Sequence, residues 1–290
     1  MTTIQAGSES ATTEQASTQV LALPAGPAQP VLLISAGPGD PGLLTLHAYQ
    51  ALQKAEVILH DALVSSAILA LIPSGVTLIA VGKRCGAHSM DQREIERVMI
   101  AKAHAGLRVV RLKGGDAMMF GRIGEEMAAL KAAAVPYRVV PGVTAASACS
   151  AYGAMPLTHR SLSQGVTLIT GRGRDGGSVA DWSPYVALGH TLVIYMGLKR
   201  AAAIQQGLLQ AGLDGQTPVA IVGQASQPGH QRVIGRLEQL TSLSQTPGLP
   251  SPAAIIVGAV VQLADELDWF QSNDRLDWKS LNTNLFSAAM

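Results

Sequence analysis

VLLISAGPGDPGLLTL, residues 31 to 46, passes from an apolar run through a loop of glycines and prolines into a helical pattern. The run Val31 to Ser35 predicts a buried strand, and the residues from Leu43 to Ala55 predict a helix. The same order recurs downstream, with strands predicted at 57–60, 76–81, 108–112 and 137–140 and helices at 66–72, 91–105 and 122–134. Strands that alternate with helices predict a mostly parallel sheet covered by helices on both faces.

A second series of strands follows the segment from Pro156 to Arg160. Strands are predicted at 166–170, 191–195, 219–222, 231–234 and 254–257, with a helix near 200–211. The short spacing of the last two strands predicts a partly antiparallel sheet. The expected organisation is therefore two α/β domains with a cleft between them: a flexible tail (1–30), an N-terminal domain (31–155), a C-terminal domain (156–268) and a C-terminal extension (269–290).

Composition excludes several classes of protein. The 290 residues are 48% hydrophobic and 14% charged, which is enough apolar material for two cores and argues against a disordered or fibrous chain. A net charge of +1 and 4% aromatic residues disfavour a nucleic-acid-binding surface. The most apolar run, Ala253 to Val261, is about half the length of a membrane-spanning helix, so we expect a protein without a membrane partner.

The cysteines and the N-terminal residues bear on location. Cys85 and Cys149 show no metal-ligand spacing, so we expect no metal site and a reduced compartment, the cytoplasm. Residues 1–30 lack the basic start and apolar core of a secretory signal. Too few residues precede Val31 to fold a further module, so we expect the two domains to stand alone.

The loop from Gly37 to Gly42 satisfies the pattern G-x-G-x-x-G, and Asp61 follows at about the spacing of a ribose-binding acid. A dinucleotide-dependent oxidoreductase is therefore one alternative. The backbone N–H groups of such a loop hold a pyrophosphate, and Pro38 and Pro41 each remove one. A structural turn with Pro41 at the first helical position is the other interpretation.

A second glycine-rich turn, Gly114-Gly115-Asp116, ends the strand predicted at 108–112. Two adjacent glycines let a ligand approach the backbone, and the carboxylate of Asp116 can face a cation or hydroxyl groups. The alternative is a plain turn in which Asp116 caps a helix. We explain Glu125 and Glu126 by the helix dipole alone and assign them no catalysis.

Basic residues collect at the predicted loop ends although the chain is almost neutral. On one rim they would bind a small ligand with several carboxylates, because guanidinium groups pair with carboxylates in a bidentate manner. Ordinary solvated loop charge is the alternative. The residues are Lys83, Arg84, Arg111, Lys113, Arg122, Arg160, Arg172 and Arg174, with His159 beside them.

The order and spacing of many short motifs resemble the tetrapyrrole (corrin/porphyrin) methylase family from about Val31 to Ala264. The motifs are SAGPGDPGLLTL, HDALV, VGKRCGAHS, RVVRLKGGD, FGRIGEE, VVPGVTAASA, MPLTHR, VTLITG, TLVIYMGL and IIVGAVV. The resemblance is strongest to members that methylate uroporphyrinogen III. It implies two α/β domains, a homodimer and S-adenosyl-L-methionine as methyl donor, with S-adenosyl-L-homocysteine as the product of the donor.

The implied reaction transfers two methyl groups to uroporphyrinogen III and gives precorrin-2 by way of precorrin-1, for sirohaem, cobalamin or haem d1 synthesis. Asp61 and Lys83 match the family's proposed acid/base positions, and Arg111 is a further candidate base or an anchor for carboxylates. Arg111, Arg160 and Met196 match expected substrate contacts. The resemblance places the donor against Pro38, Gly114, Gly115, Asp116, Met119, Thr144, Ala145, Met196 and Ala225.

The chain departs from the family's usual GGDPFxFGRGGEE pattern. Ala117, Met118 and Ile123 replace a proline, an aromatic residue and a glycine, which bears on the rigidity of the donor loop. His60 stands where tyrosine is common, and Arg172 where histidine often follows Thr-Gly. A protein that binds the tetrapyrrole or the donor without turnover is therefore a second alternative.

Overall fold

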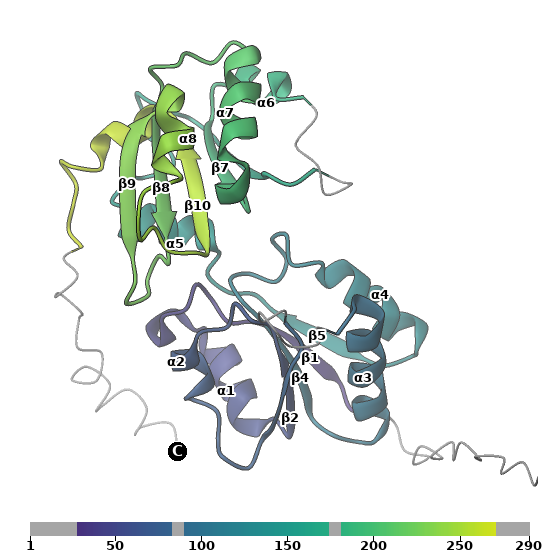
Figure 1. The fold of residues 1–290 in the computed structure, drawn as a ribbon. Coiled ribbons are helices and arrows are strands. Elements are labelled where there is room, and N and C mark those ends of the chain that lie inside the picture. The colour runs from purple at the N-terminus through teal and green to yellow at the C-terminus, as the bar shows by residue number, and fades with distance from the viewer. Residues whose placement is uncertain (1–27, 83–89, 174–180, 271–290) are drawn as a thin grey trace, which may run out of the picture.

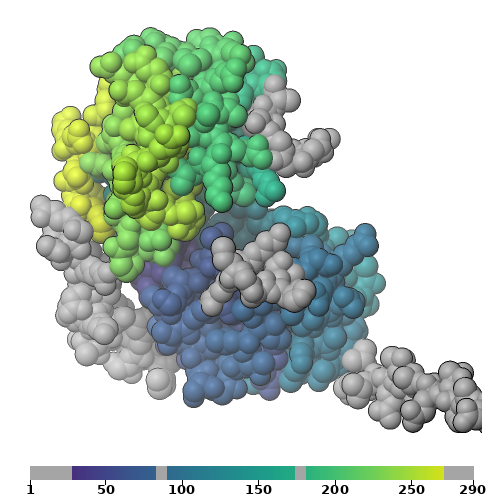
Figure 2. Space-filling view, in the orientation of Figure 1, coloured from purple at the N-terminus to yellow at the C-terminus, as the bar shows by residue number. Residues whose placement is uncertain are grey.

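The protein consists of two lobes, each built on a five-stranded sheet (Figure 1). A computed structural model describes residues 28–82, 90–173 and 181–270. The space-filling view shows the lobe of the first sheet in purple to teal below the green to yellow lobe of the second sheet (Figure 2). The predicted class, α/β with two sheets, is confirmed.

The first sheet is parallel throughout. Its strands are β1 (Val31–Ser35), β2 (Val57–His60), β3 (Thr77–Ala80), β4 (Val109–Lys113) and β5 (Tyr137–Val140). They lie in the order β3-β2-β4-β1-β5, with Leu33 opposite Arg111. The central strands β1, β2 and β4 are almost entirely buried because helices cover both of their faces. The predicted strands are confirmed to within a residue at each end.

Helices cover both faces of this sheet. They are α1 (Leu46–Lys54) and α2 (Ser66–Leu69) on one face, and α3 (Gln92–His104) and α4 (Ile123–Ala132) on the other. Successive residues of a strand point to opposite faces, so Leu33 packs in the core with α3 and α4 while Ile34 packs in the core with α1 and α2.

The first predicted helix begins later than the apolar pattern indicates. A short 3-10 turn, η1 (Pro41–Leu43), comes first, and Asp40 caps it by accepting from the Gly42 N–H at 2.8 Å. Thr45 then caps α1 by accepting a hydrogen bond from the Ala48 N–H at 3.2 Å. The chain therefore turns twice after β1, and this double turn places the glycine-rich loop over the end of the strand.

The second sheet is mixed. Its strands are β6 (Val166–Thr170), β7 (Thr191–Tyr195), β8 (Pro218–Gly223), β9 (Gln231–Arg236) and β10 (Ala253–Val257). Their order is β6-β7-β10-β8-β9, and only β6 and β7 pair in parallel. The predicted antiparallel part is confirmed, although the two strands whose short spacing suggested it, β9 and β10, do not pair with each other and lie on either side of β8. Because β10 runs against both of its neighbours, β7 and β8 point the same way and end at the same edge.

Helices also cover both faces of the second sheet. On one face lie α6 (Ser183–Ala187), α7 (Ala201–Gln210) and α8 (Leu240–Leu243), with the 3-10 turns η2 (Leu198–Arg200) and η3 (Leu237–Gln239). On the other lie α5 (Ala145–Tyr152) and the 3-10 turn η4 (Ala259–Leu263). The domain ranges 31–155 and 156–268 stay a prediction, although α5 precedes their boundary and packs on the second sheet.

Among the helices in the described parts of the chain, none is both long and apolar enough to cross a membrane.

Truncation of a central strand residue tests the first core. Leu33 on β1 is fully buried, so we expect Leu33→Ala to lower the free energy of unfolding by about 2–5 kcal/mol through lost burial and a residual cavity. Leu78 on the edge strand β3 is 45% exposed, and Leu78→Ala should change it by less than ~0.5 kcal/mol. Urea unfolding of both variants measures the difference, and equal losses would contradict this description of the core.

Candidate active site

Two glycine-rich turns meet where β1 and β4 end. The Gly37 N–H donates to the Gly115 carbonyl at 3.0 Å, and the Gly115 N–H donates to the Gly37 carbonyl at 2.8 Å. These bonds join the loop of residues 36–42 to the loop of residues 114–122. The carboxyl ends of parallel strands are the usual ligand-binding edge of an open α/β sheet.

The geometry of the second turn requires glycine. A Cβ on Gly114 would lie 2.8 Å from the Cβ of Leu63, which is too close for any side chain. Gly115 has a φ of +67°, in the left-handed region, and its missing Cβ would point towards the backbone nitrogen of Ala145 at 3.9 Å. The turn therefore leaves space in front of the first N–H group of α5.

Asp116 belongs to this turn and is half-buried. Its Oδ1 accepts from the Met118 N–H at 3.0 Å and from the Ser35 hydroxyl at 3.4 Å. The Ser35 hydroxyl in turn accepts from the Ala117 N–H at 2.9 Å. The carboxylate thus stabilises its own turn through one oxygen, although it does not cap a helix as the structural alternative expected, and it can present the other oxygen to a ligand.

Loops of the second lobe reach the same place. The Gln227 side chain donates from Nε2 to the Pro38 carbonyl at 2.9 Å, and the Tyr152 hydroxyl lies 3.3 Å from Oδ2 of Asp40. Gly39 has no room for a Cβ, which would lie 2.6 Å from the Gln227 side chain. The two lobes therefore contact each other directly across the first glycine-rich loop.

Tyr195 at the end of β7 holds the start of α5 and also gives the lobes a second contact, through Phe120. Its hydroxyl accepts from the Ala146 N–H at 2.9 Å and lies 2.7 Å from Oγ1 of Thr144, at the N-terminus of α5. Its ring packs against Phe120, with centroids 4.9 Å apart. Burial raises the pKa of Tyr195, so the hydroxyl stays protonated at neutral pH and keeps these contacts.

Backbone strain concentrates around these loops. Seven of the described residues other than glycine have a positive φ. Two of them, Ala134 and Ala154, lie just after the helices α4 and α5, where helices commonly end in this way. The others lie in the loops that follow β4, β7 and β8: Phe120, Arg122, Met196, Gln224 and Ser226. Left-handed backbone in residues other than glycine is costly and gathers at functional sites.

The contacts above bring most of the predicted donor residues to one place, the donor cradle. Pro38 contacts Gln227, Gly115 faces Ala145, and Thr144 is bonded to the neighbour of Met196. Ala225 is buried between two strained residues after β8, and Met119 lies beside Phe120, which packs on Tyr195. Their contact with a donor stays a prediction.

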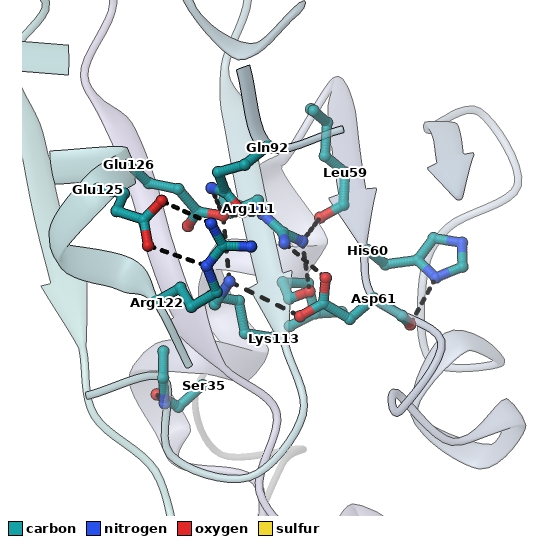
Figure 3. A network of polar contacts seen from close by, with 12 residues as sticks. Ser35, Leu59, His60, Asp61, Gln92, Arg111, Lys113, Arg122, Glu125 and Glu126 are labelled. Carbon is teal, nitrogen blue, oxygen red and sulfur yellow. Dashed lines mark hydrogen bonds and ion pairs between the residues drawn. The ribbon is translucent and has the colours of Figure 1, made fainter. Parts of the chain in front are cut away.

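Beside the donor cradle lies a network of charged groups (Figure 3). The Arg111 guanidinium pairs through Nη2 with Oδ1 of Asp61 at 2.5 Å and through Nε with Oε1 of Glu126 at 3.0 Å. The Lys113 ammonium lies 3.1 Å from Oε1 of Glu126 and 3.7 Å from Oδ2 of Asp61. The two cations of β4 thus lie between the carboxylate of Asp61, just after β2, and the carboxylate of Glu126, on α4.

The expected basic rim needs a correction at Arg111 and Lys113. Their side chains are only 2% and 5% exposed, because they point into the sheet and helix layer and pair there with Glu126. The basic groups that do face solvent are Arg122, Arg160 and Arg172, with His159. Arg122 forms an exposed ion pair with Glu125 at 2.7 Å. Of the predicted residues, Lys83, Arg84 and Arg174 lie outside the described residues.

Glu126 is the main residue that the sequence argument missed. It is fully buried, and it stands between the buried residues Ile123 and Leu130 on the inner face of α4. The helix dipole explains an acid near a helix N-terminus, but not an acid on the apolar face. Glu126 is three residues after Ile123 and four before Leu130, so it shares their apolar face of the helix. This spacing is the signal in the sequence that indicates a buried cationic partner.

In the described ranges, no group of three His, Cys, Asp or Glu side chains could hold a metal ion.

Residues 30–241 match the model of the Tetrapyrrole (Corrin/Porphyrin) Methylases. The chain is 48% identical to Siroheme synthase 2 of Cronobacter sakazakii over 242 residues, covering 83% of this chain and 52% of the relative. It is 48% identical to siroheme synthase of Zymomonas mobilis over 256 residues, covering 88% and 54%. The chain therefore spans about half the length of these curated relatives.

Among solved structures, the uroporphyrin-III C-methyl transferase of Thermus thermophilus, complexed with S-adenyl homocysteine, is 41% identical, with a TM-score of 0.70. The match covers 81% of this chain and 94% of that one. The family match extends over both lobes, from the residue before β1 to the start of α8. This chain belongs to the tetrapyrrole (corrin/porphyrin) methylase family.

Proposed function

We propose that this chain is an S-adenosyl-L-methionine-dependent C-methyltransferase that acts on uroporphyrinogen III. The product is precorrin-2, formed by way of precorrin-1 in two methyl transfers. The observation that carries the proposal is the match to the Thermus enzyme, which includes 94% of that chain at 41% identity. The names of the siroheme synthase relatives favour sirohaem over cobalamin or haem d1 as the destination of the product.

The cradle between the lobes fits the donor. Gly115 leaves space in front of the Ala145 N–H, and the first N–H groups of a helix have no acceptor within the helix. The Ala145 N–H suits the polar parts that the donor shares with its product, since the Ala146 N–H already donates to Tyr195. The second oxygen of Asp116 suits hydroxyl or cationic groups. The apolar side chains of Met196 and Phe120, both partly exposed, offer contact area beside them.

Positioning supplies much of the catalysis in such a reaction, since the transferred carbon must lie about 3–3.5 Å from its acceptor. When bound, S-adenosyl-L-methionine supplies the methyl group, and its S–C bond breaks as a C–C bond forms on the ring. Asp61 accepts the proton that the macrocycle loses. Oδ2 is better placed than Oδ1 to accept this proton. Oδ1 is held by Arg111 at 2.5 Å, whereas Oδ2 lies 3.7 Å from the Lys113 ammonium. A positioned base contributes about 10²- to 10⁴-fold.

The solvent-facing basic groups suit the carboxylates of the macrocycle. Arg160 and Arg122 are exposed, and each guanidinium can hold a carboxylate in a bidentate manner. Met196 contributes an exposed apolar surface beside the donor cradle. We assign Lys83 an acid/base or anchoring role on the resemblance alone. Arg111 is buried, so its part is to hold Asp61.

The two alternatives make different predictions. A dinucleotide oxidoreductase would use the loop of residues 37–42, but Pro38 and Pro41 carry no N–H for a pyrophosphate. A protein that binds without turnover would hold the donor product yet form no methylated tetrapyrrole. Assays of turnover and of binding therefore separate all three functions.

Anaerobic incubation of the chain with uroporphyrinogen III and S-adenosyl-L-methionine tests the activity. We expect mass analysis to show a singly methylated species first and a doubly methylated species later, as precorrin-1 is converted to precorrin-2. The matched control omits the chain. Donor-product binding without any methylated tetrapyrrole would favour the binding protein, and nicotinamide-dependent absorbance changes would favour the oxidoreductase.

Two glycine substitutions test the donor cradle. Gly115 and Gly106 have φ of +67° and +78°, so alanine at either position costs roughly 1–2 kcal/mol of stability. Only Gly115→Ala puts a methyl group in front of Ala145, and we expect it to weaken S-adenosyl-L-homocysteine binding at least about tenfold, or 1.4 kcal/mol. Gly106→Ala should leave affinity within about twofold, since binding depends on local contacts. Calorimetry measures both, and equal affinities would refute the cradle.

The resemblance also implies a homodimer in the cytoplasm. The exposed side chains of Leu46 and Leu63, at 67% and 60%, offer apolar groups that an interface on the first lobe could cover. We expect light scattering to give twice the chain mass of 30.1 kDa. A mass of one chain across the concentration range of the assay would refute the dimer.

A further inference from the structure

The carboxylate of Glu126 lies at the buried end of the charged network. Its Oε1 accepts from Nε of Arg111 at 3.0 Å, from Nζ of Lys113 at 3.1 Å and from Nε2 of Gln92 at 3.3 Å. Its Oε2 has no hydrogen-bond partner among the described residues. One oxygen of a fully buried carboxylate therefore holds three donors that come from α3 and β4.

Arg111 connects Glu126 to Asp61. The guanidinium is planar and rigid, and every nitrogen is engaged: Nε with Glu126, Nη2 with Asp61, and Nη1 with the carbonyls of Leu59 and Leu112, both at 3.3 Å. A guanidinium held on three sides cannot turn without breaking several of these bonds at once. The position of Glu126 therefore sets the plane in which Asp61 is held.

Exposure differs sharply along the network. Glu126, Arg111 and Lys113 are 0%, 2% and 5% exposed, whereas the side chain of Asp61 is 27% exposed. Asp61 is thus the one member of this group of four that can meet a ligand. The other three lie behind it in the layer between the sheet, α3 and α4 (Figure 3).

Stability is a weak reason for a fold to hold such a cluster. Desolvation of buried ions offsets most of their attraction, and apolar replacements of a whole buried cluster are often neutral or stabilising. Orientation of the exposed carboxylate is a stronger reason, because a base must be held near its productive geometry to be effective.

We propose that Glu126 is a positioning residue for Asp61, acting through Arg111 and Lys113. The inference rests on the proposed function, in which Asp61 accepts the proton of the macrocycle. Loss of the Glu126 charge frees the guanidinium and the ammonium from their inner partner. Asp61 then loses its fixed orientation while the donor cradle and the solvent-facing arginines remain.

The test measures single-turnover methyl transfer at saturating uroporphyrinogen III, together with S-adenosyl-L-homocysteine affinity. We expect Glu126→Gln to lower the transfer rate constant about tenfold and Asp61→Asn to lower it about 10²-fold. In the Asp61→Asn background, Glu126→Gln should have less than about a twofold further effect, because residues that act as a unit are not additive. Donor-product affinity should stay within about twofold in all variants, since the two sites are separate.

The matched control is Glu56→Gln. Glu56 and Arg108 form an exposed ion pair at 3.4 Å just before β2 and β4. Asp61 and Lys113 lie at the other ends of these strands. The substitution therefore removes the carboxylate partner of an arginine beside the same sheet without touching the network. We expect an unchanged transfer rate.

A second variant keeps the test decisive if Glu126→Gln folds poorly. Lys113→Met combined with Glu126→Gln removes one charge of each sign and leaves the Arg111 and Asp61 pair balanced. The same loss of about tenfold is expected, because the inner support of Arg111 is gone. An unchanged rate in either folded variant would overturn the inference. So would a Glu126→Gln effect of equal size in the parent chain and in the Asp61→Asn background.

A crystal structure of Glu126→Gln separates this inference from the proposed function. We expect the Asp61 carboxylate and the Arg111 guanidinium to move apart, whether or not the parent chain transfers methyl groups. An intact pair in the variant would overturn the positioning role. Absence of methyl transfer by the parent chain would instead count against the proposed function.

Discussion

Parallel pairing of β1 with β4 is the constraint on which the rest of the molecule depends. Parallel neighbours need crossover connections, and each crossover returns the chain to the same starting edge of the sheet. Every loop that follows a strand therefore lies at the opposite edge, where the Gly37 and Gly115 turns meet and exchange two backbone hydrogen bonds. The donor cradle and the charged network both stand at this edge.

The second lobe completes the edge rather than forming a separate site. Because β10 is antiparallel to β7 and to β8, the latter two end together, and their loops carry Met196 and Gln224 in strained conformations. Gln227 then donates a hydrogen bond to Pro38 of the first lobe, and the ring of Tyr195 packs against Phe120 of that lobe. Relative movement of the lobes would break these contacts, so the contacts of the lobes and the shape of the cradle are coupled.

The charged network adds a chemical element to this geometry. Arg111 and Lys113 on β4 lie close to Asp61, which follows β2, but only Asp61 retains substantial exposure, because the two cations pair with Glu126 in the interior. In the proposed function, the exposed arginines hold carboxylates of the macrocycle while the buried arginine holds Asp61, the proposed base. Burial thus divides residues of one charge between two roles, which the list of basic residues in the sequence does not distinguish.

The strand order along the chain, the glycine turn at Gly114 and Gly115, and the family can all be predicted from the sequence. Apolar runs and glycine pairs are local signals, and many motifs in one order are specific. The helix α5 was missed because Ala145 to Tyr152 has no strong apolar period and its residues pack on a sheet formed later in the chain.

The folded chain alone shows that Arg111 and Lys113 are buried, that Glu126 pairs with both, and that Tyr195 and Gln227 contact residues of the first lobe. Each depends on groups 13 to 189 residues apart in the chain. Local propensity and motif spacing say nothing about which distant side chains a parallel sheet brings to one edge, because register and layer packing are properties of the assembled fold.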